Sequence, residues 1–138
     1  MRSYRVLLVL VTAGCYAHSL NEPSVVVGTY ALVTIQGHAP PQIVIDAPGC
    51  QITVIGGSLV LKPDRRFELW LQEVEACPTP TEPGTVAELF VGSYTLSGSN
   101  VVLHAVGDPS TDYYGRMRSG RLVVPLGYQF GDVEFTPP

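Results

Sequence analysis

The sequence predicts an all-β protein made of about eight or nine short antiparallel strands. Segments rich in β-branched and aromatic residues recur at roughly ten-residue spacing, and turn-forming residues separate them. The chain has 138 residues, of which 14 are glycine, 12 are proline, 46% are hydrophobic and 14% are charged, which suits one folded sheet domain. Residues 66–74 alternate with a period of two, which places Phe67, Leu69 and Leu71 on one face and Glu68, Trp70 and Gln72 on the other.

The N-terminus predicts export. Arg2 and Arg5 precede the apolar run Val6–Val11, and small residues then lead to Cys15. This order is typical of a secretory signal, and the run is too short to cross about 30 Å of hydrocarbon as a permanent helix. The segment Leu10–Cys15 resembles the bacterial lipobox, which implies diacylation of Cys15 with palmitate-type chains, cleavage before Cys15 and anchoring by the lipidated cysteine.

The lipobox resemblance divides the chain into three parts. Residues 1–14 would be the signal peptide, residues 15–26 the lipid-acceptor cysteine and a tether, and residues 27–138 the barrel domain. No acidic residue follows Cys15 directly, and by resemblance to lipoprotein sorting this favours the outer membrane of the cell envelope. Secretion without a lipid anchor is the alternative.

The individual strands are predicted from composition and from the turns between them. Gly56-Gly57 interrupts one apolar segment and indicates a bulge or a barrel corner. Pro63 and Asp64 favour a chain reversal, the three prolines of Pro78–Gly84 predict a loop, and Pro125 places its strand at an edge or at the end of a pairing. The predicted strands are 25–35, 42–46, the two pieces 50–55 and 58–62, and then 66–74, 86–96, 101–106, 111–118, 121–126 and 128–135. An up-and-down barrel and a sandwich both fit this pattern.

Cys50 and Cys77 are predicted to form a disulfide. Export would place them in an oxidising compartment, where a disulfide persists. If the hairpin is symmetric about the bond between Pro63 and Asp64, paired residue numbers sum to 127, as those of Cys50 and Cys77 do. A bulge at Gly56-Gly57 would shift this register by one residue.

Four stretches resemble the small bacterial lipocalin-like lipoproteins, and they are Gly28–Tyr30, Gly57–Leu61, Gly92–Gly98 and Gly120–Val124. Thr111-Asp-Tyr113 also resembles the second lipocalin signature. The resemblance implies an antiparallel up-and-down barrel of about eight strands. It further implies that the Tyr30 ring packs against an arginine from a late strand, Arg121 in preference to Arg116, and closes one end of the barrel.

The candidate ligand-binding residues are four aromatic residues and one arginine, namely Tyr30, Trp70, Tyr94, Tyr113 and Arg116. If the apolar strand faces form the interior, Trp70 lies outside, where it is placed to contact a partner. If the interior is a ligand cavity, the more polar faces line it. The sequence leaves these alternatives open, together with a core filled by its own side chains.

No catalytic residue, metal site or cofactor is predicted. His18, His38 and His104 do not stand at a metal-ligand spacing, and Gly-x-Ser-x-Gly does not occur. Glu73 and Glu75 share a strand face, and we expect them at a solvated, charged rim. The net charge of −4 offers no basic surface for nucleic acid.

The leading prediction is therefore a non-catalytic cell-envelope lipoprotein with a lipocalin-like barrel. Its partners would be membrane lipid, through the acyl groups of Cys15, and either a small apolar ligand or a protein. The alternatives are an exported enzyme inhibitor, which would use a rim loop such as Cys77–Gly84, and a structural envelope protein.

Overall fold

The computed structural model describes residues 23–78, 85–107 and 110–138, so the signal peptide and Cys15 lie outside the described residues. Within them the chain forms nine strands and no helix. The strands are β1 (Gly28–Ile35), β2 (Gln42–Ala47), β3 (Cys50–Leu61), β4 (Arg66–Ala76), β5 (Thr85–Ser97), β6 (Asn100–Ala105), β7 (Thr111–Arg118), β8 (Arg121–Pro125) and β9 (Asp132–Thr136). The all-β prediction is confirmed.

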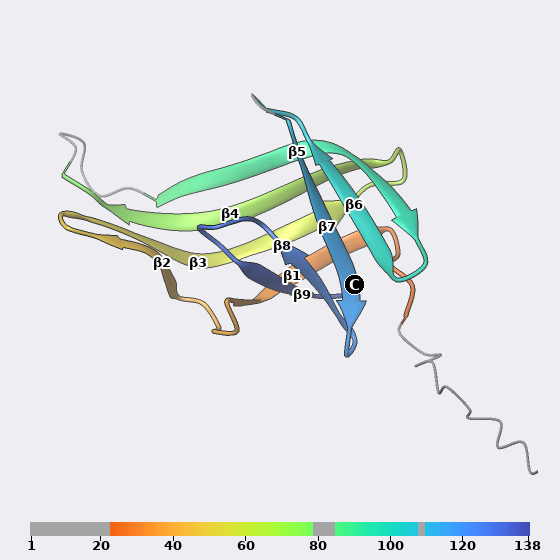
Figure 1. The fold of residues 1–138 in the computed structure, drawn as a ribbon, viewed down its shortest axis with the longest axis horizontal. Coiled ribbons are helices and arrows are strands. Elements are labelled where there is room, and N and C mark those ends of the chain that lie inside the picture. The colour runs from red at the N-terminus through yellow and green to blue at the C-terminus, as the bar shows by residue number, and fades with distance from the viewer. Residues whose placement is uncertain (1–22, 79–84, 108–109) are drawn as a thin grey trace, which may run out of the picture.

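Eight of these strands close into an antiparallel barrel (Figure 1). Strands β3 to β9 pair in chain order, and β1 pairs with β9 on one side and with the second half of β3 on the other. Strand β2 adds to the first half of β3 and is the one strand of the described chain outside the closed ring. This closure decides between the two predicted architectures, because a sandwich would leave two separate sheets.

The barrel interior is packed with apolar side chains from all eight strands. The largest of them have an exposed fraction of at most 1%: Tyr30, Ile35, Leu59, Leu61, Phe67, Leu69, Leu71, Leu103, Leu122 and Phe135. The alternation predicted for residues 66–74 is therefore correct, with Phe67, Leu69 and Leu71 facing inward. Each such burial contributes roughly 1.5–3 kcal/mol relative to exposure, so this cluster is the main source of stability.

Glycines allow the strands to bend around this core. A Cβ atom on Gly57 would lie 2.4 Å from the carbonyl oxygen of Trp70, and one on Gly92 would lie 1.9 Å from the carbonyl oxygen of His104. The register of β3 against β4 shifts by one residue between Val54 and Gly56, which confirms the predicted bulge. Because the bulge bends the strand without ending it, β3 is one continuous strand, where the sequence predicted two pieces.

The last strand also differs from its prediction. Residues 128–131 belong to a loop between Leu126 and Gly131, and β9 begins at Asp132. The amide of Leu126 donates to the carbonyl of Gly131, and that of Gly131 donates to the carbonyl of Gly127. This tight turn places Phe130 in the core with an exposed fraction of 3%. The aromatic residue that suggested a strand is therefore buried from a loop.

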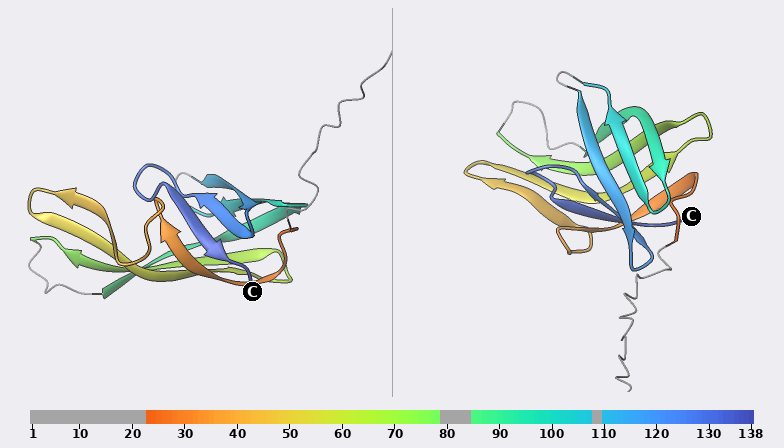
Figure 2. Two further views of the ribbon diagram at one scale, coloured as in Figure 1. Left: turned by 90° about the horizontal axis from the view of Figure 1, so that it is seen from below. Right: turned by 45° about the vertical axis from the view of Figure 1, so that its right-hand side comes forward.

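We call one end of the barrel the turn end, because the hairpin turns at Lys62–Arg65, Gly98-Ser99 and Ser119-Gly120 lie there. The chain reversal predicted at Pro63 and Asp64 is present, and Asp64 Oδ1 accepts a hydrogen bond of 3.1 Å from the Arg66 amide there. The described chain also begins at this end (Figure 2). The Val25 amide donates to the carbonyl of Gly98 at 2.9 Å, and the Val25 side chain is buried, so at least this residue of the predicted tether is docked on the barrel.

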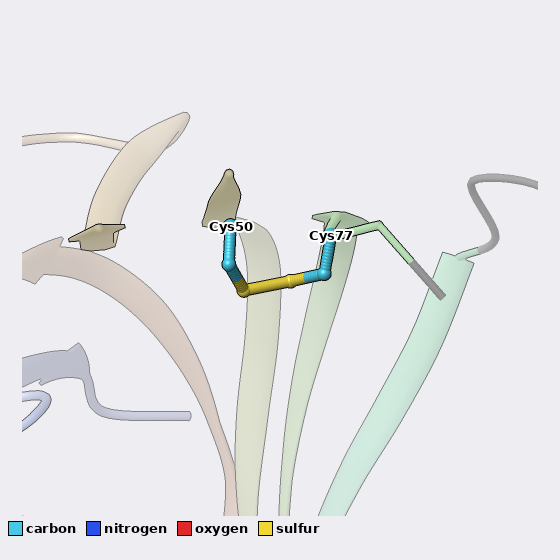
Figure 3. Close-up of a disulfide and its surroundings, with 2 residues drawn as sticks. All are labelled: Cys50 and Cys77. Carbon is cyan, nitrogen blue, oxygen red and sulfur yellow. A yellow bond between two sulfur atoms is a disulfide. The ribbon is translucent and has the colours of Figure 1, made fainter. Parts of the chain in front are cut away.

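The opposite end carries what we call the arm, formed by β2, residues 50–55 of β3, residues 72–76 of β4 and the start of β5. These strands continue past the short strands β6 to β9 and project from the barrel (Figure 2). Cys50 and Cys77 lie side by side at the tip of the arm and form the predicted disulfide (Figure 3). It closes a covalent loop with a sequence separation of 27. It joins β3 to β4 at the tip of the arm, beyond the ends of β6 to β9.

Candidate functional site at the arm end

Among the described residues, one charged side chain is buried in the barrel. Glu73 follows Phe67, Leu69 and Leu71 on the inward face of β4 and has an exposed fraction of only 4%. It stands opposite Val54 of β3, which is fully buried. The expectation that Glu73 lies at a solvated rim was therefore wrong, because β4 continues its alternation into the arm and keeps every second side chain inside.

The surroundings of Glu73 favour its protonated form. Burial is the main cause, followed by the negative charge of Glu88 on β5 and a hydrogen bond between the two carboxyls, with a smaller contribution from the charge of Glu75. Together they raise the pKa of Glu73 from 4.5 to about 7. Below about pH 7 Glu73 is therefore mainly protonated, and its proton lies in the hydrogen bond between the two carboxyls.

One oxygen of this pair lacks a partner. Oε1 of Glu73 is buried and accepts no hydrogen bond from any described residue. A buried polar atom without a partner costs about 1–3 kcal/mol. The site therefore gains stability when a donor is placed at this oxygen, either by a water molecule or by a polar group of a ligand.

Aromatic rings lie next to the carboxyl pair. Phe90 stands two residues after Glu88 on the same face of β5 and packs edge to face against Tyr113 of β7, with ring centroids 6.0 Å apart. Phe130 makes a second edge-to-face contact with Phe90, at 6.4 Å. Burial, and to a lesser extent the negative charge of Glu88, raise the pKa of Tyr113. The arm end thus combines an apolar wall with one polar anchor, as small-molecule sites do.

Tyr113 is the one candidate ligand-binding residue from the sequence that belongs to this site. Tyr30 and Tyr94 lie inside the barrel at the turn end, and both hydroxyls are used by the backbone. The Tyr30 hydroxyl donates to the carbonyl of Val26 at 2.7 Å and accepts from its amide at 2.9 Å, while that of Tyr94 donates to the carbonyl of Lys62 at 2.6 Å. Their positions indicate a structural role in closing the turn end.

Trp70 and Arg116 lie on the outer surface. Trp70 has an exposed fraction of 41% and borders a groove of about 340 Å³, which Gly57, Ser58, Gln72 and Ala87 also line. Arg116 is exposed on β7. The five candidate residues thus occupy three separate parts of the molecule.

The predicted contact between Tyr30 and Arg121 is wrong. Arg121 begins β8 with its side chain on the outer face, where its guanidinium donates to the carboxylate of Glu134 at 2.8 Å. Tyr30 points inward, so the barrel wall separates the two groups. Hydrogen bonds between Tyr30 and the docked segment around Val26 close this end instead.

The described part of the chain holds neither a metal-binding cluster nor a membrane-spanning helix. His104 pairs with Asp112 at 2.8 Å on the outer face, and among the described residues no three His, Cys, Asp or Glu side chains gather closely enough to hold a metal ion. No helix in residues 23–78, 85–107 and 110–138 is long and apolar enough to cross a membrane. The chain matches no protein-family model, no curated protein and no solved structure.

The carboxyl pair escaped the sequence analysis although a signal for half of it was present. The parity that places Phe67, Leu69 and Leu71 inside continues without interruption to Glu73. Glu88 could be assigned only from the register of β5 against β4, in which it stands opposite Leu71. That register depends on a loop too long to fix strand pairing by turn geometry.

Proposed function

We propose that this protein is a non-catalytic exported lipoprotein of the bacterial cell envelope whose lipocalin-like barrel binds a small, largely apolar ligand at the arm end. The observation that supports ligand binding best is Glu73, a buried carboxyl with an oxygen that has no described hydrogen-bond partner, next to the apolar core. A purely structural barrel gains nothing from such a group, since a leucine at this position would avoid the cost of burial. The neighbouring rings of Phe90, Tyr113 and Phe130 supply apolar contact area for the body of the ligand.

Two adjacent tyrosines of β7 provide a matched test. Tyr113 faces the carboxyl pair, whereas Tyr114 is on the outer face with an exposed fraction of 66%. Titration with the neutral dye N-phenylnaphthylamine, followed by its fluorescence, should show binding that Tyr113→Ala weakens by about fivefold or more. Tyr114→Ala should change the affinity by less than about twofold. Absence of dye binding, or equal losses in both variants, would refute a site at the arm end.

The lipid anchor rests on the resemblance of Leu10–Cys15 to the lipobox. We expect the mature protein from a bacterial host to start at Cys15 and to carry acyl chains, which mass spectrometry of its N-terminal peptide measures directly. Cys15→Ser should abolish acylation and release the protein from the membrane fraction. An unmodified N-terminus beyond residue 15 would contradict the anchor and leave export intact.

A second candidate function is contact with a protein partner through the outer face of the barrel. Trp70 stands directly opposite Leu89 on neighbouring strands, and Val91 follows two residues later, with exposed fractions of 41%, 43% and 36%. Exposed apolar side chains gathered in this way are typical of interaction surfaces. If Trp70→Ala abolishes binding of the dye while Tyr113→Ala does not, this outer surface is the better site.

A further inference from the structure

The carboxyls at the arm end face no cation from residues 23–78, 85–107 and 110–138. Glu73, Glu75 and Glu88 occupy the inward face of β4 and β5. Lys62, Arg65 and Arg66 belong to the hairpin turn at the opposite end. The three other basic residues of the described strands, Arg116, Arg118 and Arg121, alternate with buried residues on the outer faces of β7 and β8.

This arrangement defines the charge that a ligand must bring. An anionic ligand would be repelled by the three carboxyls, and a neutral one would leave the charge of the pair without compensation. A metal ion does not fit either, because these carboxyls do not gather closely enough to chelate one. An ammonium group fits, since it donates up to three hydrogen bonds and Oε1 of Glu73 is a buried acceptor without a described partner.

The aromatic wall favours the same group. Phe90 lies two residues from Glu88 on the same strand face, and its ring contacts the ring of Tyr113. The negative charge of Glu88 also raises the pKa of Tyr113. A cation held at the carboxyls therefore lies beside aromatic rings, which stabilise it further when it is partly desolvated. An alkyl chain attached to the ammonium would then contact the apolar residues of the arm.

We propose, building on the function proposed above, that the ligand is a small amphiphilic amine whose ammonium group displaces the proton shared by Glu73 and Glu88. Binding then ionises both carboxyls and releases that proton to solvent. The titratable groups that face the pair are Glu75 on the same strand and Tyr113 on β7, while β3 contributes the uncharged Val54. None of these supplies a positive charge, so below about pH 7 the pair keeps its proton until a cation arrives.

The sign of the pH dependence follows from the proton released. The pKa of Glu73 is about 7 in the free protein. Below this pH the amine must displace a bound proton, so its affinity should rise by up to about tenfold per pH unit towards pH 7 and level off above it. A neutral ligand of the same length should show no such rise.

The test compares three probes of equal chain length by titration calorimetry with the full-length protein, namely octylamine, octanol and octanoate. We expect octylamine to bind at least about tenfold more tightly than octanol at pH 8, with octanoate weakest. Titrations at pH 6 in two buffers with different ionisation enthalpies should report the release of nearly one proton per octylamine bound. Glu73→Gln and Glu88→Gln should each abolish the proton release and the preference for the amine. The matched control Glu68→Gln, on the outer face of β4, should preserve both.

The outcomes separate the two proposals. Equal, pH-independent binding of octylamine and octanol would overturn the amine assignment and keep the ligand site. Tighter binding of octanoate would overturn it as well. Failure of every probe, together with failure of the neutral dye, would refute the proposed function itself.

Discussion

The turn end and the arm end of this barrel are built on the same strands but differ in how their polar atoms are satisfied. At the turn end the hydroxyls of Tyr30 and Tyr94 are buried, and both are hydrogen-bonded to the backbone. At the arm end Glu73 is equally buried, yet one of its oxygens accepts no hydrogen bond from the described residues. Hydrogen-bonding every buried polar atom favours stability. A buried polar atom without a hydrogen-bond partner is therefore a candidate for a functional role.

The largest expected effect tests the turn end. Tyr30→Ala should lower the free energy of unfolding by about 4 kcal/mol, because it removes a fully buried ring and leaves a cavity. Tyr113→Ala, at the half-buried arm end, should cost less than about 2 kcal/mol. Denaturant unfolding of both variants measures the difference. Equal losses would show that the two ends are equally important for folding and would contradict the comparison.

A somewhat smaller effect is expected from the disulfide. Replacing Cys50 and Cys77 together by serine should cost about 3.5 kcal/mol, since a covalent loop with a separation of 27 restricts the unfolded chain. The folded-state consequence should be local. Hydrogen exchange should accelerate in residues 50–54 and 74–76 while the amides around Tyr30 stay protected. Uniform acceleration throughout the barrel would mean that the arm does not open independently.

The smallest of the three effects concerns Glu73 and depends on pH. Its pKa is higher in the folded protein than in the unfolded chain, so the folded state holds a proton that the unfolded chain has released between pH 4.5 and about 7. The free energy of unfolding should therefore fall as pH rises through this window, by up to about 3 kcal/mol. Glu73→Gln should remove this fall and be more stable than the wild type at pH 8. A wild-type stability that is flat between pH 5 and pH 8 would show that Glu73 ionises normally.

The sequence predicted correctly those features of the fold that depend on a local pattern of residues. The alternation in residues 66–74 fixed the inward face of β4, and turn residues marked most strand ends. The pairing of Cys50 with Cys77 was correct for a subtler reason. Near the turn, paired numbers sum to 128, as Leu61 with Phe67 does, and the bulge restores 127 beyond Val54. The assumed symmetry was wrong at the turn, and the bulge compensated for it.

Features that depend on the closed barrel could not be predicted in this way. The place of Arg121 outside and Tyr30 inside follows from β8 pairing with β9, a contact that no local pattern specifies. The loop that buries Phe130 resembles a strand in composition, because burial selects aromatic residues in loops and strands alike. The carboxyl pair likewise joins two strands whose register is set by the whole sheet.

The docking of Val25 at the turn end also sets how the molecule would be presented at a membrane. Ten residues lead from Cys15 to Val25, and an extended chain of that length reaches at most about 35 Å. With Cys15 acylated, as we propose, the docked Val25 stays within that distance of the bilayer surface, while the arm lies at the opposite end of the barrel. The anchor would therefore join the barrel at the end that Tyr30 and Tyr94 seal, and not at the end that carries Glu73.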